Sequence, residues 1–284
     1  PTPQMIEAMM KAKVGDDVFG EDVSINELEN ITASMFGMEA AIFCPSGTMT
    51  NQIAIKCHSQ PGDEVICDES SHIYQYEGGG IASNSGASVK LLQGNLGRIN
   101  ADLVKVAINA DDVHKANTSL VSLENTSNRG GGSCYDFEEI KKLQALCKEN
   151  QLAFHLDGAR LWNALVAKKE TAKQYGEAFD SISVCLSKSL GCPVGSLLVG
   201  KKDFIKKARR VRKAFGGGMR QAGFIAAAGI YALDDTITAP NLVSKLKLEN
   251  ILGYAISPNR VRLVLHLDIN VQMVNKTIEV FNSL

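Results

Sequence analysis

The sequence SISVCLSKSLGCPVGS, residues 181–196, carries the strongest structural signal of the chain. Its first five residues, Ser181 to Cys185, predict a buried β-strand, and the polar turn after them contains one lysine, Lys188. The chain becomes apolar again at 197–199. In α/β enzymes, the carboxyl end of a buried strand is where a reactive amine is placed. Lys188 is therefore either such an amine or an ordinary solvated lysine in a loop between strands.

Composition narrows the class of protein. The 284 residues are 45% hydrophobic, which is enough for one large domain, alone or with a small one. The net charge is −1 and the basic residues are mostly dispersed, which argues against a nucleic-acid-binding protein. The 7 cysteines lack metal-ligand spacing, and their odd number argues against a disulfide framework. Because no run of 18 apolar residues and no signal segment is present, we expect a cytoplasmic protein without a metal or a membrane partner.

Short apolar strands alternate with helical patterns over most of the chain. The predicted strands are 40–44, 64–67, 87–92, 119–124, 152–157 and 181–185, and helices are predicted between and after them. The capping box Ser24-Ile-Asn-Glu27 predicts that Ser24 begins one of these helices. This alternation predicts βαβ units and a mostly parallel sheet that is covered on both faces. A strand at 260–267 and a helix at 274–284 then predict a large domain, 1–233, and a small one, 234–284.

Polar residues recur where predicted strands end. The segment Ser46-Gly47-Thr48 follows one strand and opens a helix, whose free N–H groups suit a phosphate, although a plain helix cap explains it equally well. Asp157 ends another strand and needs a partner if it is buried. That partner is either Arg160, in a structural turn, or a protonated pyridine nitrogen of a cofactor that also needs a lysine such as Lys188.

The stretch from 201 to 213 contains eight basic residues in a helical pattern, and either a solvated helix face or an anion-binding patch explains it. These residues are Lys201, Lys202, Lys206, Lys207, Arg209, Arg210, Arg212 and Lys213.

Seven segments, taken together, resemble one family. They are GDDVFGED at 15–22, PSGTM at 45–49, HIYQYE at 72–77, LENT at 123–126, HLDGAR at 155–160, SK at 187–188 and GGGMRQ at 216–221. In this order they resemble the threonine aldolases, pyridoxal phosphate enzymes with the aspartate-aminotransferase-like fold that are related to the β-eliminating lyases. The resemblance implies an α/β fold of three layers around a mostly parallel sheet, the fold type I of pyridoxal phosphate enzymes, with a small α+β C-terminal domain.

The resemblance also implies site residues. Lys188 resembles the lysine that binds pyridoxal 5'-phosphate covalently, with Ser187 beside it, and Asp157 resembles the partner of the pyridine nitrogen. His72 resembles the imidazole that stacks on the cofactor ring, and it is also a candidate catalytic base. The other implied residues bind the cofactor (Ser46, Gly47, Thr48, Arg160, Lys213, Arg220) or the substrate (Arg160, Arg262, Tyr76, Ser127). In relatives, the counterparts of Lys213 and Arg220 often come from a neighbouring subunit, so we expect a homodimer or homotetramer.

The implied activity is cleavage of L-threonine, L-allo-threonine or a related β-hydroxy-α-amino acid to glycine and an aldehyde. The alternatives are a β-eliminating or other carbon–carbon lyase on the same cofactor, and an interaction protein that keeps the fold without the activity. A nicotinamide dehydrogenase is disfavoured because no GxGxxG follows the first strand.

Three departures from the family pattern stand out. Ser127 replaces a histidine that many relatives have. The chain starts at Pro1 without the Ser/Asp-Thr segment that precedes this region in relatives, and only residues 234–258 join the last long helix to the C-terminal strand. We therefore expect terminal and internal segments to be missing from this sequence, which leaves the small domain incomplete.

Overall fold

The computed structural model describes residues 1–234, 243, 246–257, 260–263 and 268–283. The chain divides into two compact units, Pro1–Ala232 and Leu233–Leu284.

The first unit is built on a seven-stranded sheet in the order β1-β7-β6-β5-β4-β2-β3. Its strands are β1 Ala40–Cys44, β2 Glu64–Asp68, β3 Ser88–Leu92, β4 Thr118–Glu124, β5 Ala153–Gly158, β6 Ser181–Cys185 and β7 Ser196–Gly200. β7 runs antiparallel to β1 and β6, and the other neighbours are parallel. The prediction of a mostly parallel sheet is therefore confirmed, and the strand predicted at 181–185 coincides with β6.

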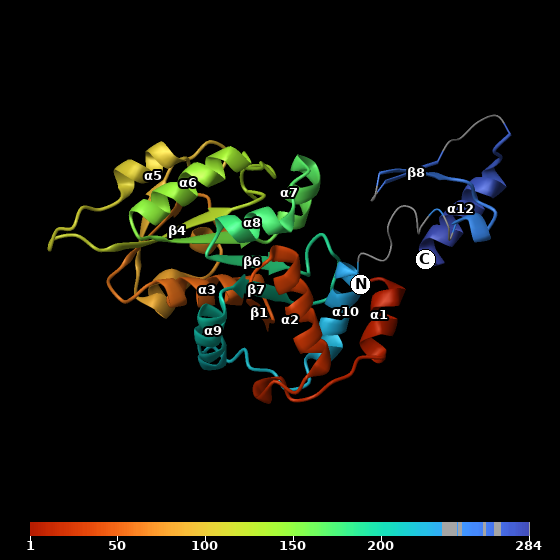
Figure 1. Cartoon of the computed structure of the whole chain (residues 1–284), viewed down its shortest axis with the longest axis horizontal. Coiled ribbons are helices and arrows are strands. Elements are labelled where there is room, and N and C mark those ends of the chain that lie inside the picture. Colours follow the sequence, from red (N-terminus) through yellow and green to blue (C-terminus); the bar gives the residue numbers. More distant parts are fainter. Residues whose placement is uncertain (235–242, 244–245, 258–259, 264–267, 284) are drawn as a thin grey trace. The chain divides into compact units, whose positions relative to one another are not determined.

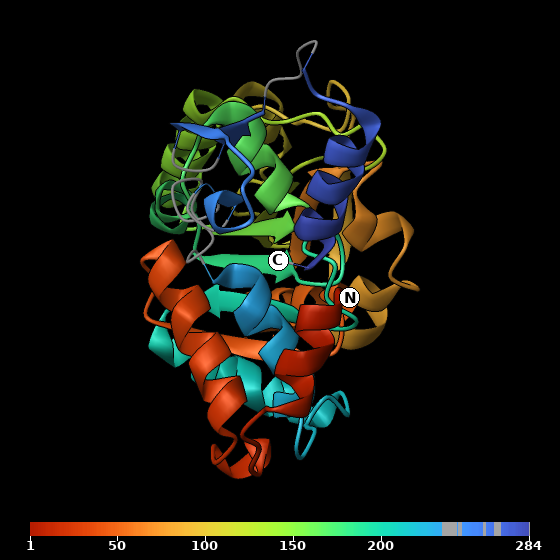
Figure 2. The ribbon, with the colours of Figure 1, turned by 90° about the vertical axis from the view of Figure 1, so that its right-hand side faces the viewer.

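Helices cover both faces of this sheet. Figure 1 shows α5 Ala101–Ala107, α6 Phe137–Glu149 and α8 Ala172–Ala178 on one side, and α3 Gly47–His58 and α9 Lys202–Ala214 on the other. In the turned view of Figure 2, the green and cyan strands in the middle of the sheet lie side by side. The remaining helical segments of the unit are α1 Pro3–Met10, η1 Asp17–Phe19, α2 Val23–Phe36, α4 His72–Gln75, η2 Ile81–Ser85, α7 Leu161–Lys168 and α10 Gly223–Leu233.

Most residues of α3 are buried. Ile53 packs toward β1, β7 and α9, and Ile55 packs toward β2 and β4, each fully buried. Burial of an aliphatic side chain of this size contributes about 1.5–3 kcal/mol. Between these apolar anchors and the start of α3 lie three buried polar residues, Thr50, Asn51 and Gln52. Buried polar groups require hydrogen-bond partners, and those partners lead into the site described below.

The start of α2 differs from the prediction. Asp22, not Ser24, caps the helix, because its Oδ1 accepts a hydrogen bond from the N–H of Ile25 at 3.0 Å. Oδ2 of the same carboxylate accepts from the N–H of Gly223 at 2.9 Å. The Ser24 hydroxyl instead donates to the carbonyl of Lys13 at 2.9 Å. A contact to a distant part of the chain thus moves the helix start to Asp22.

The second unit contains an antiparallel strand pair, β8 Tyr254–Ser257 and β9 Arg260–Arg262, and the helix α12 Val271–Ser283. The strand predicted at 260–267 begins as expected, and residues 264–267 lie outside the described part of the chain. The helix predicted from Val274 starts three residues earlier, at Val271.

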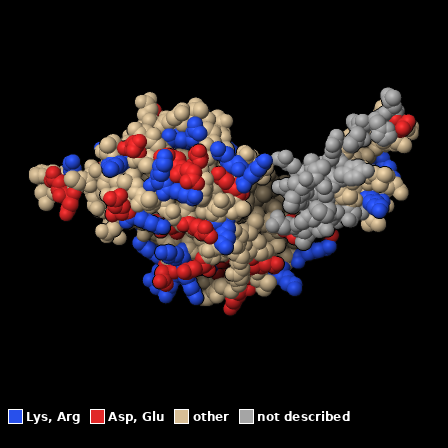
Figure 3. Space-filling model, turned by 45° about the horizontal axis from the view of Figure 1, so that its top comes forward, with Lys and Arg blue, Asp and Glu red and all other residues tan. Residues whose placement is uncertain are grey.

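The charged side chains on one face of the protein are of both signs (Figure 3). On the face drawn in Figure 3, lysine and arginine side chains are interspersed with aspartate and glutamate. Among the described residues, the helices are all too short or too polar to span a membrane.

All 7 cysteines are free thiols. Six are buried, and Cys134 is partly exposed.

Candidate active site

The site lies at one edge of the sheet, where parallel strands end together. Asp157 of β5 lies between Glu124 of β4 and Ser183 of β6 in the strand register. Lys188 follows the end of β6 in the turn toward β7. Within this turn the N–H of Leu186 donates to the Gly195 carbonyl at 3.0 Å, and the carbonyl of Lys188 accepts from the N–H of Gly191 at 3.0 Å. The sheet therefore brings together residues that are far apart in sequence, as the alternation of strands predicts.

Asp157 is the central carboxylate of the site, with 2% of its surface exposed. Its Oδ2 accepts from Nδ2 of Asn51 at 3.0 Å, and its Oδ1 accepts from the N–H of Ala159 at 3.1 Å. Burial raises the pKa of Asp157 to about 7, and the negative charges of Glu124 and Glu77 act in the same direction. Among the described residues, no ion pair joins Asp157 to a basic side chain, so the structural turn with Arg160 is not observed.

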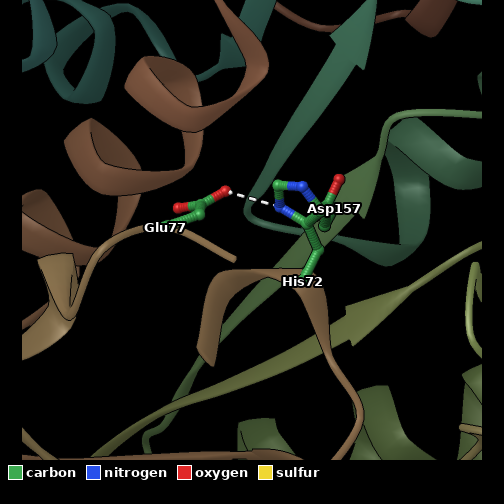
Figure 4. Close-up of side chains that lie close together, drawn as sticks. All are labelled: His72, Glu77 and Asp157. Atoms are coloured by element: carbon green, nitrogen blue, oxygen red, sulfur yellow. Dashed lines mark hydrogen bonds and ion pairs between the residues drawn. The ribbon is translucent and has the colours of Figure 1, made fainter. Parts of the chain in front are cut away.

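His72 begins α4 and faces the same carboxylates (Figure 4). Its Nδ1 lies 3.1 Å from Oε1 of Glu77, and its backbone N–H donates to Oε2 of Glu124 at 2.9 Å. The hydrogen bond to Glu77 raises the pKa of His72, and partial burial acts against it. Two glutamates thus fix this residue, one through its backbone and one through its ring.

Glu77 is buried and accepts hydrogen bonds from three side chains. Its Oε1 accepts from Asn51 at 2.9 Å as well as from His72, and its Oε2 accepts from Gln52 at 2.6 Å. The amides of Asn51 and Gln52 donate to both oxygens of Glu77, so this side chain acts as a hydrogen-bond acceptor. The His72 ring therefore presents Nδ1–H to Glu77, which leaves Nε2 as the acceptor of the neutral ring. The sequence segment contains Glu77, but no local signal assigns it this contact.

His72, Glu77 and Asp157 also bring possible metal-ligand atoms within 4.8 Å of one another. The amide NH₂ of Asn51, however, donates to both carboxylates. A metal ion bound to these oxygens would lie against the partly positive N–H hydrogens of the Asn51 amide. The arrangement suits a hydrogen-bond donor better than a metal.

The start of α3 approaches the end of β6. A Cβ at Gly47 would lie 2.7 Å from Sγ of Cys185, so glycine is required for this close approach. The Ser46 hydroxyl caps the helix by accepting from the N–H of Met49 at 3.2 Å. The remaining N–H groups of the first turn, which include those of Gly47 and Thr48, have no partner within a helix. The predicted cap is confirmed, and the same turn keeps donors available for an anion.

Charged side chains surround the Cys185 thiol. Burial raises its pKa, the hydrogen bond from Ser196 lowers it, and the charges of Lys188 and Arg160 also lower it. Ser187 and Lys188 are exposed, and Arg160 is half-buried. Within the described part of the chain, neither Lys188 nor Arg160 forms an ion pair. Both cations are therefore available to a ligand.

Tyr76 lies beside His72, with ring centroids 5.7 Å apart. The guanidinium of Arg129 lies 4.8 Å from the centroid of the Tyr76 ring. Ser127 is buried, and its Oγ accepts from the N–H of Gly130 at 3.2 Å. The described hydrogen bonds of Ser127 are thus within its own loop, and its side chain also packs against Gly97. Its predicted contact with a substrate stays a prediction.

Part of the basic helix α9 has a structural role. Arg212 forms a buried ion pair with Asp17 at 2.7 Å and donates to the carbonyl of Phe43, and Arg209 pairs with Glu29. These contacts join α9 to η1, α2 and β1.

Three further basic residues are implied as site residues by the resemblance. Lys213 is exposed and lines a cavity of about 500 Å³ with Asp17. Arg220 pairs with Asp16 at 2.5 Å. The backbone of Arg262 belongs to β9, and its side chain lies outside the described part of the chain. The predicted roles of Lys213, Arg220 and Arg262 therefore stay predictions.

The chain is similar to proteins of one known family. The model of the β-eliminating lyase family matches residues 1–274. The low-specificity L-threonine aldolase of Escherichia coli K12 is 45% identical over 238 residues, which cover 84% of this chain and 71% of that protein. The low-specificity L-threonine aldolase of Saccharomyces cerevisiae is 47% identical over 230 residues, which cover 80% of this chain and 59% of that protein.

A solved structure gives the same fold. The threonine aldolase of Leishmania major matches with a TM-score of 0.73 at 23% identity, covering 90% of this chain and 79% of that one. The sheet-edge cluster and these matches lead to one assignment: the chain belongs to the β-eliminating lyase family and, within it, to the threonine aldolases, which are lyases.

Proposed function

We propose that the chain is a pyridoxal 5'-phosphate-dependent aldolase that cleaves L-threonine, L-allo-threonine or a related β-hydroxy-α-amino acid to glycine and an aldehyde. The observation that carries this proposal is the position of Asp157, a buried carboxylate without a basic partner among the described residues, at the same sheet edge as the unpaired Lys188. The names of the similar proteins support the reaction.

The residues fit the cofactor. Asp157 lies beside two further carboxylates, Glu77 and Glu124, and a protonated ring nitrogen would supply the positive charge that this cluster lacks. The first turn of α3, where Gly47 leaves no space for a Cβ, offers backbone donors to a phosphate. Lys188 provides the exposed amine that a carbonyl cofactor requires. We propose that Ser46, Thr48 and Ser187 contact the cofactor as well.

When bound, pyridoxal phosphate withdraws electrons from the α-carbon of an amino acid, so that a bond to that carbon can break. The contribution of Asp157 is to stay ionised and hold the proton on the ring nitrogen. Arg160, which is near Cys185 and forms no ion pair with a described residue, is suited to bind the substrate carboxylate by two parallel hydrogen bonds. We assign the second such contact to Arg262.

His72 is suited to remove the proton of the substrate hydroxyl. Because Nδ1–H donates to Glu77, Nε2 has the free lone pair, and the same hydrogen bond makes the ring more basic. The partly exposed ring can also stack on the cofactor, as the resemblance implies. The two roles are compatible, and substitutions separate them.

We further propose that the first unit binds the cofactor and that Lys213 and Arg220 complete the site of a neighbouring subunit in a cytoplasmic homodimer or homotetramer. Both side chains are exposed, Lys213 beside a cavity and Arg220 in an ion pair with Asp16, which leaves them accessible to another subunit. The free thiols support a reducing location.

Product analysis of the purified protein tests the proposed reaction. We expect threonine and allo-threonine of the L series to give glycine and acetaldehyde in equal amounts, and the D enantiomers to give neither. 2-Oxobutanoate and ammonia in place of glycine and acetaldehyde would instead indicate β-elimination. Lys188→Ala should lose the covalently bound, coloured cofactor. A colourless wild-type protein that ignores added pyridoxal phosphate would contradict the proposal.

A further inference from the structure

A continuous chain of hydrogen bonds extends from Asp157 into the interior of the first unit. Nδ2 of Asn51 lies 3.0 Å from Oδ2 of Asp157, and Oδ1 of Asn51 lies 3.2 Å from Nε2 of His155. Nδ1 of His155 lies 2.8 Å from Oγ of Ser181, which lies 2.8 Å from Nε2 of His58. The chain therefore joins four side chains behind the carboxylate.

Regular secondary structure places these side chains in line. Asn51 and His58 are seven residues apart on α3, so they lie on one face of that helix. His155 and Asp157 are two residues apart on β5, so they point to the same face of the sheet. Ser181 lies opposite His155 in the parallel pairing of β5 and β6. Asn51 and His58 of α3 therefore face His155 of β5 and Ser181 of β6.

The donor and the acceptor of each hydrogen bond can be assigned by starting from Asp157. The side chain of Asn51 touches carboxyl oxygens of Asp157 and Glu77, which accept hydrogen bonds, so its NH₂ group faces them. Its oxygen then faces His155, which must donate from Nε2. Burial lowers the pKa of His155 to about 3, so this ring is neutral and has one N–H. Nδ1 of His155 must therefore accept.

The same logic continues to the far end. Ser181 donates its hydroxyl proton to Nδ1 of His155, so its oxygen accepts from Nε2–H of His58. Burial lowers the pKa of His58 to about 4, so this ring is neutral as well. His58 is held in place by stacking on Phe204, with centroids 4.5 Å apart. Every donor in the chain therefore points toward Asp157.

We propose that Asn51, His155, Ser181 and His58 form a one-way hydrogen-bond chain that positions the carboxylate of Asp157 and keeps it ionised to receive the protonated ring nitrogen of the cofactor. This inference rests on the proposed function, because Asp157 needs to stay ionised only if it faces such a nitrogen. Aligned hydrogen bonds polarise one another, so each link increases the positive charge that Asn51 presents to Asp157. The four side chains are positioning residues, since they act on the cofactor through Asp157.

The variant Ser181→Ala breaks the chain at its middle without touching Asp157. The matched control is Ser183→Ala, because Ser183 is also fully buried on β6 but its hydroxyl contacts Thr50 at 2.5 Å instead of a histidine. We expect Ser181→Ala to weaken binding of pyridoxal phosphate to the full-length protein by about threefold to tenfold, the range expected for one lost hydrogen bond. Ser183→Ala should leave the dissociation constant of pyridoxal phosphate unchanged.

A second measurement determines which ring nitrogens of His155 and His58 carry a proton. In protein labelled with ¹⁵N-histidine, with and without cofactor, we expect His155 and His58 to be neutral and protonated on Nε2. In Ser181→Ala the Nδ1 resonance of His155 should move toward the value of a nitrogen without a hydrogen bond, whereas in Ser183→Ala it should stay in place. A role in packing alone would not produce this difference.

The outcomes separate the two proposals. Protonation of His155 on Nδ1 would overturn the proposed hydrogen-bond chain, while the proposed function stands. Equal dissociation constants of pyridoxal phosphate for the two serine variants would have the same consequence. A wild-type protein that binds no pyridoxal phosphate would overturn the proposed function and, with it, the purpose assigned to the chain.

Discussion

Glu77 holds the ring of His72 through a hydrogen bond of 3.1 Å between Oε1 and Nδ1, and its carboxylate is itself buried. An acid that fixes the tautomer of a histidine and raises its basicity is a recurring arrangement for proton transfer. This pair is therefore the most direct place to test whether His72 acts as a base.

Glu77→Gln keeps the shape of the side chain and removes its charge. Because Glu77 raises the pKa of His72, its loss lowers that pKa. We expect the acid limb of kcat/KM, which reports the base in its neutral form, to move to lower pH. The plateau should fall by about tenfold to a hundredfold, because the base is weaker and less well held. Glu69→Gln, at an exposed position nearby, is the control and should change neither quantity.

His72→Phe separates stacking from proton transfer. The phenyl ring can still stack on the cofactor but accepts no proton. We expect the dissociation constant of pyridoxal phosphate to stay within about threefold of wild type, and kcat to fall by about 10²-fold to 10⁴-fold, the usual contribution of a positioned base. If turnover persists at the wild-type rate, the ring only stacks.

Asp157 should make the stability of the cofactor-free protein depend on pH. Its pKa is near 4 in the unfolded chain and about 7 in the folded one, because of burial and the charges of Glu124 and Glu77, with His72 acting in the opposite direction. Between these values the folded state holds a proton that the unfolded state releases, so stability falls as pH rises from 4 to 7. The full effect is at most about 4 kcal/mol.

Thermal unfolding of the cofactor-free protein between pH 4 and pH 8 measures this effect. Asp157→Asn has no such titration, and its melting temperature should decline less steeply over the same range. Parallel curves for the two proteins would show that Asp157 titrates normally.

Gly47→Ala should destabilise the chain, since the new methyl group would lie 2.7 Å from Sγ of Cys185. We expect a loss of about 1–3 kcal/mol in the free energy of unfolding, the usual cost of an overpacked site. Cys185→Ala removes the sulfur, so the double variant should recover part of this loss. A double-mutant cycle by urea denaturation measures the coupling, and simple additivity would mean that the two positions do not touch in solution.

Asp22→Ala tests the corrected start of α2. The carboxylate supplies a helix cap and a bond to Gly223, so its removal should cost about 2–3 kcal/mol of folding free energy. Ser24→Ala is the control, because Ser24 makes one hydrogen bond and no cap, and we expect it to cost about 1 kcal/mol or less. If both variants lost the same folding free energy, Ser24 would be as good a candidate for the helix cap as Asp22.

Much of the fold could be predicted because its signals are local. β6 is buried at all five positions, so it appears in the sequence as a continuous run followed by a polar turn. Short elements with few buried residues give a weaker signal: α8 buries Tyr175 and Ala178, and it is only seven residues long. The start of α2 was wrong because two residues could each cap the helix, and a contact to Gly223, about 200 residues away, decides between them.

The candidate site could be predicted only in part for the same reason. Asp157 and Lys188 follow strands, and parallel strands bring their ends together, so their proximity follows from the alternation of elements. Asn51 and Glu77 were not assigned a role, because their contacts join residues 26 or 106 positions apart and leave no spacing pattern. The run of three polar residues from Thr50 to Gln52, directly before the apolar residues 53–55, was the available signal for Asn51.

The distribution of the cysteines has a practical consequence. Burial keeps six of the seven thiols away from solvent, so a maleimide dye added to the native protein should attach at Cys134. Burial also raises the pKa of the Cys134 thiol, so labelling should be slow at neutral pH. This thiol follows directly on the bridge between Ser127 and Ser133. The unaltered chain therefore offers one attachment point for a fluorescent reporter, placed on the loop that leaves β4.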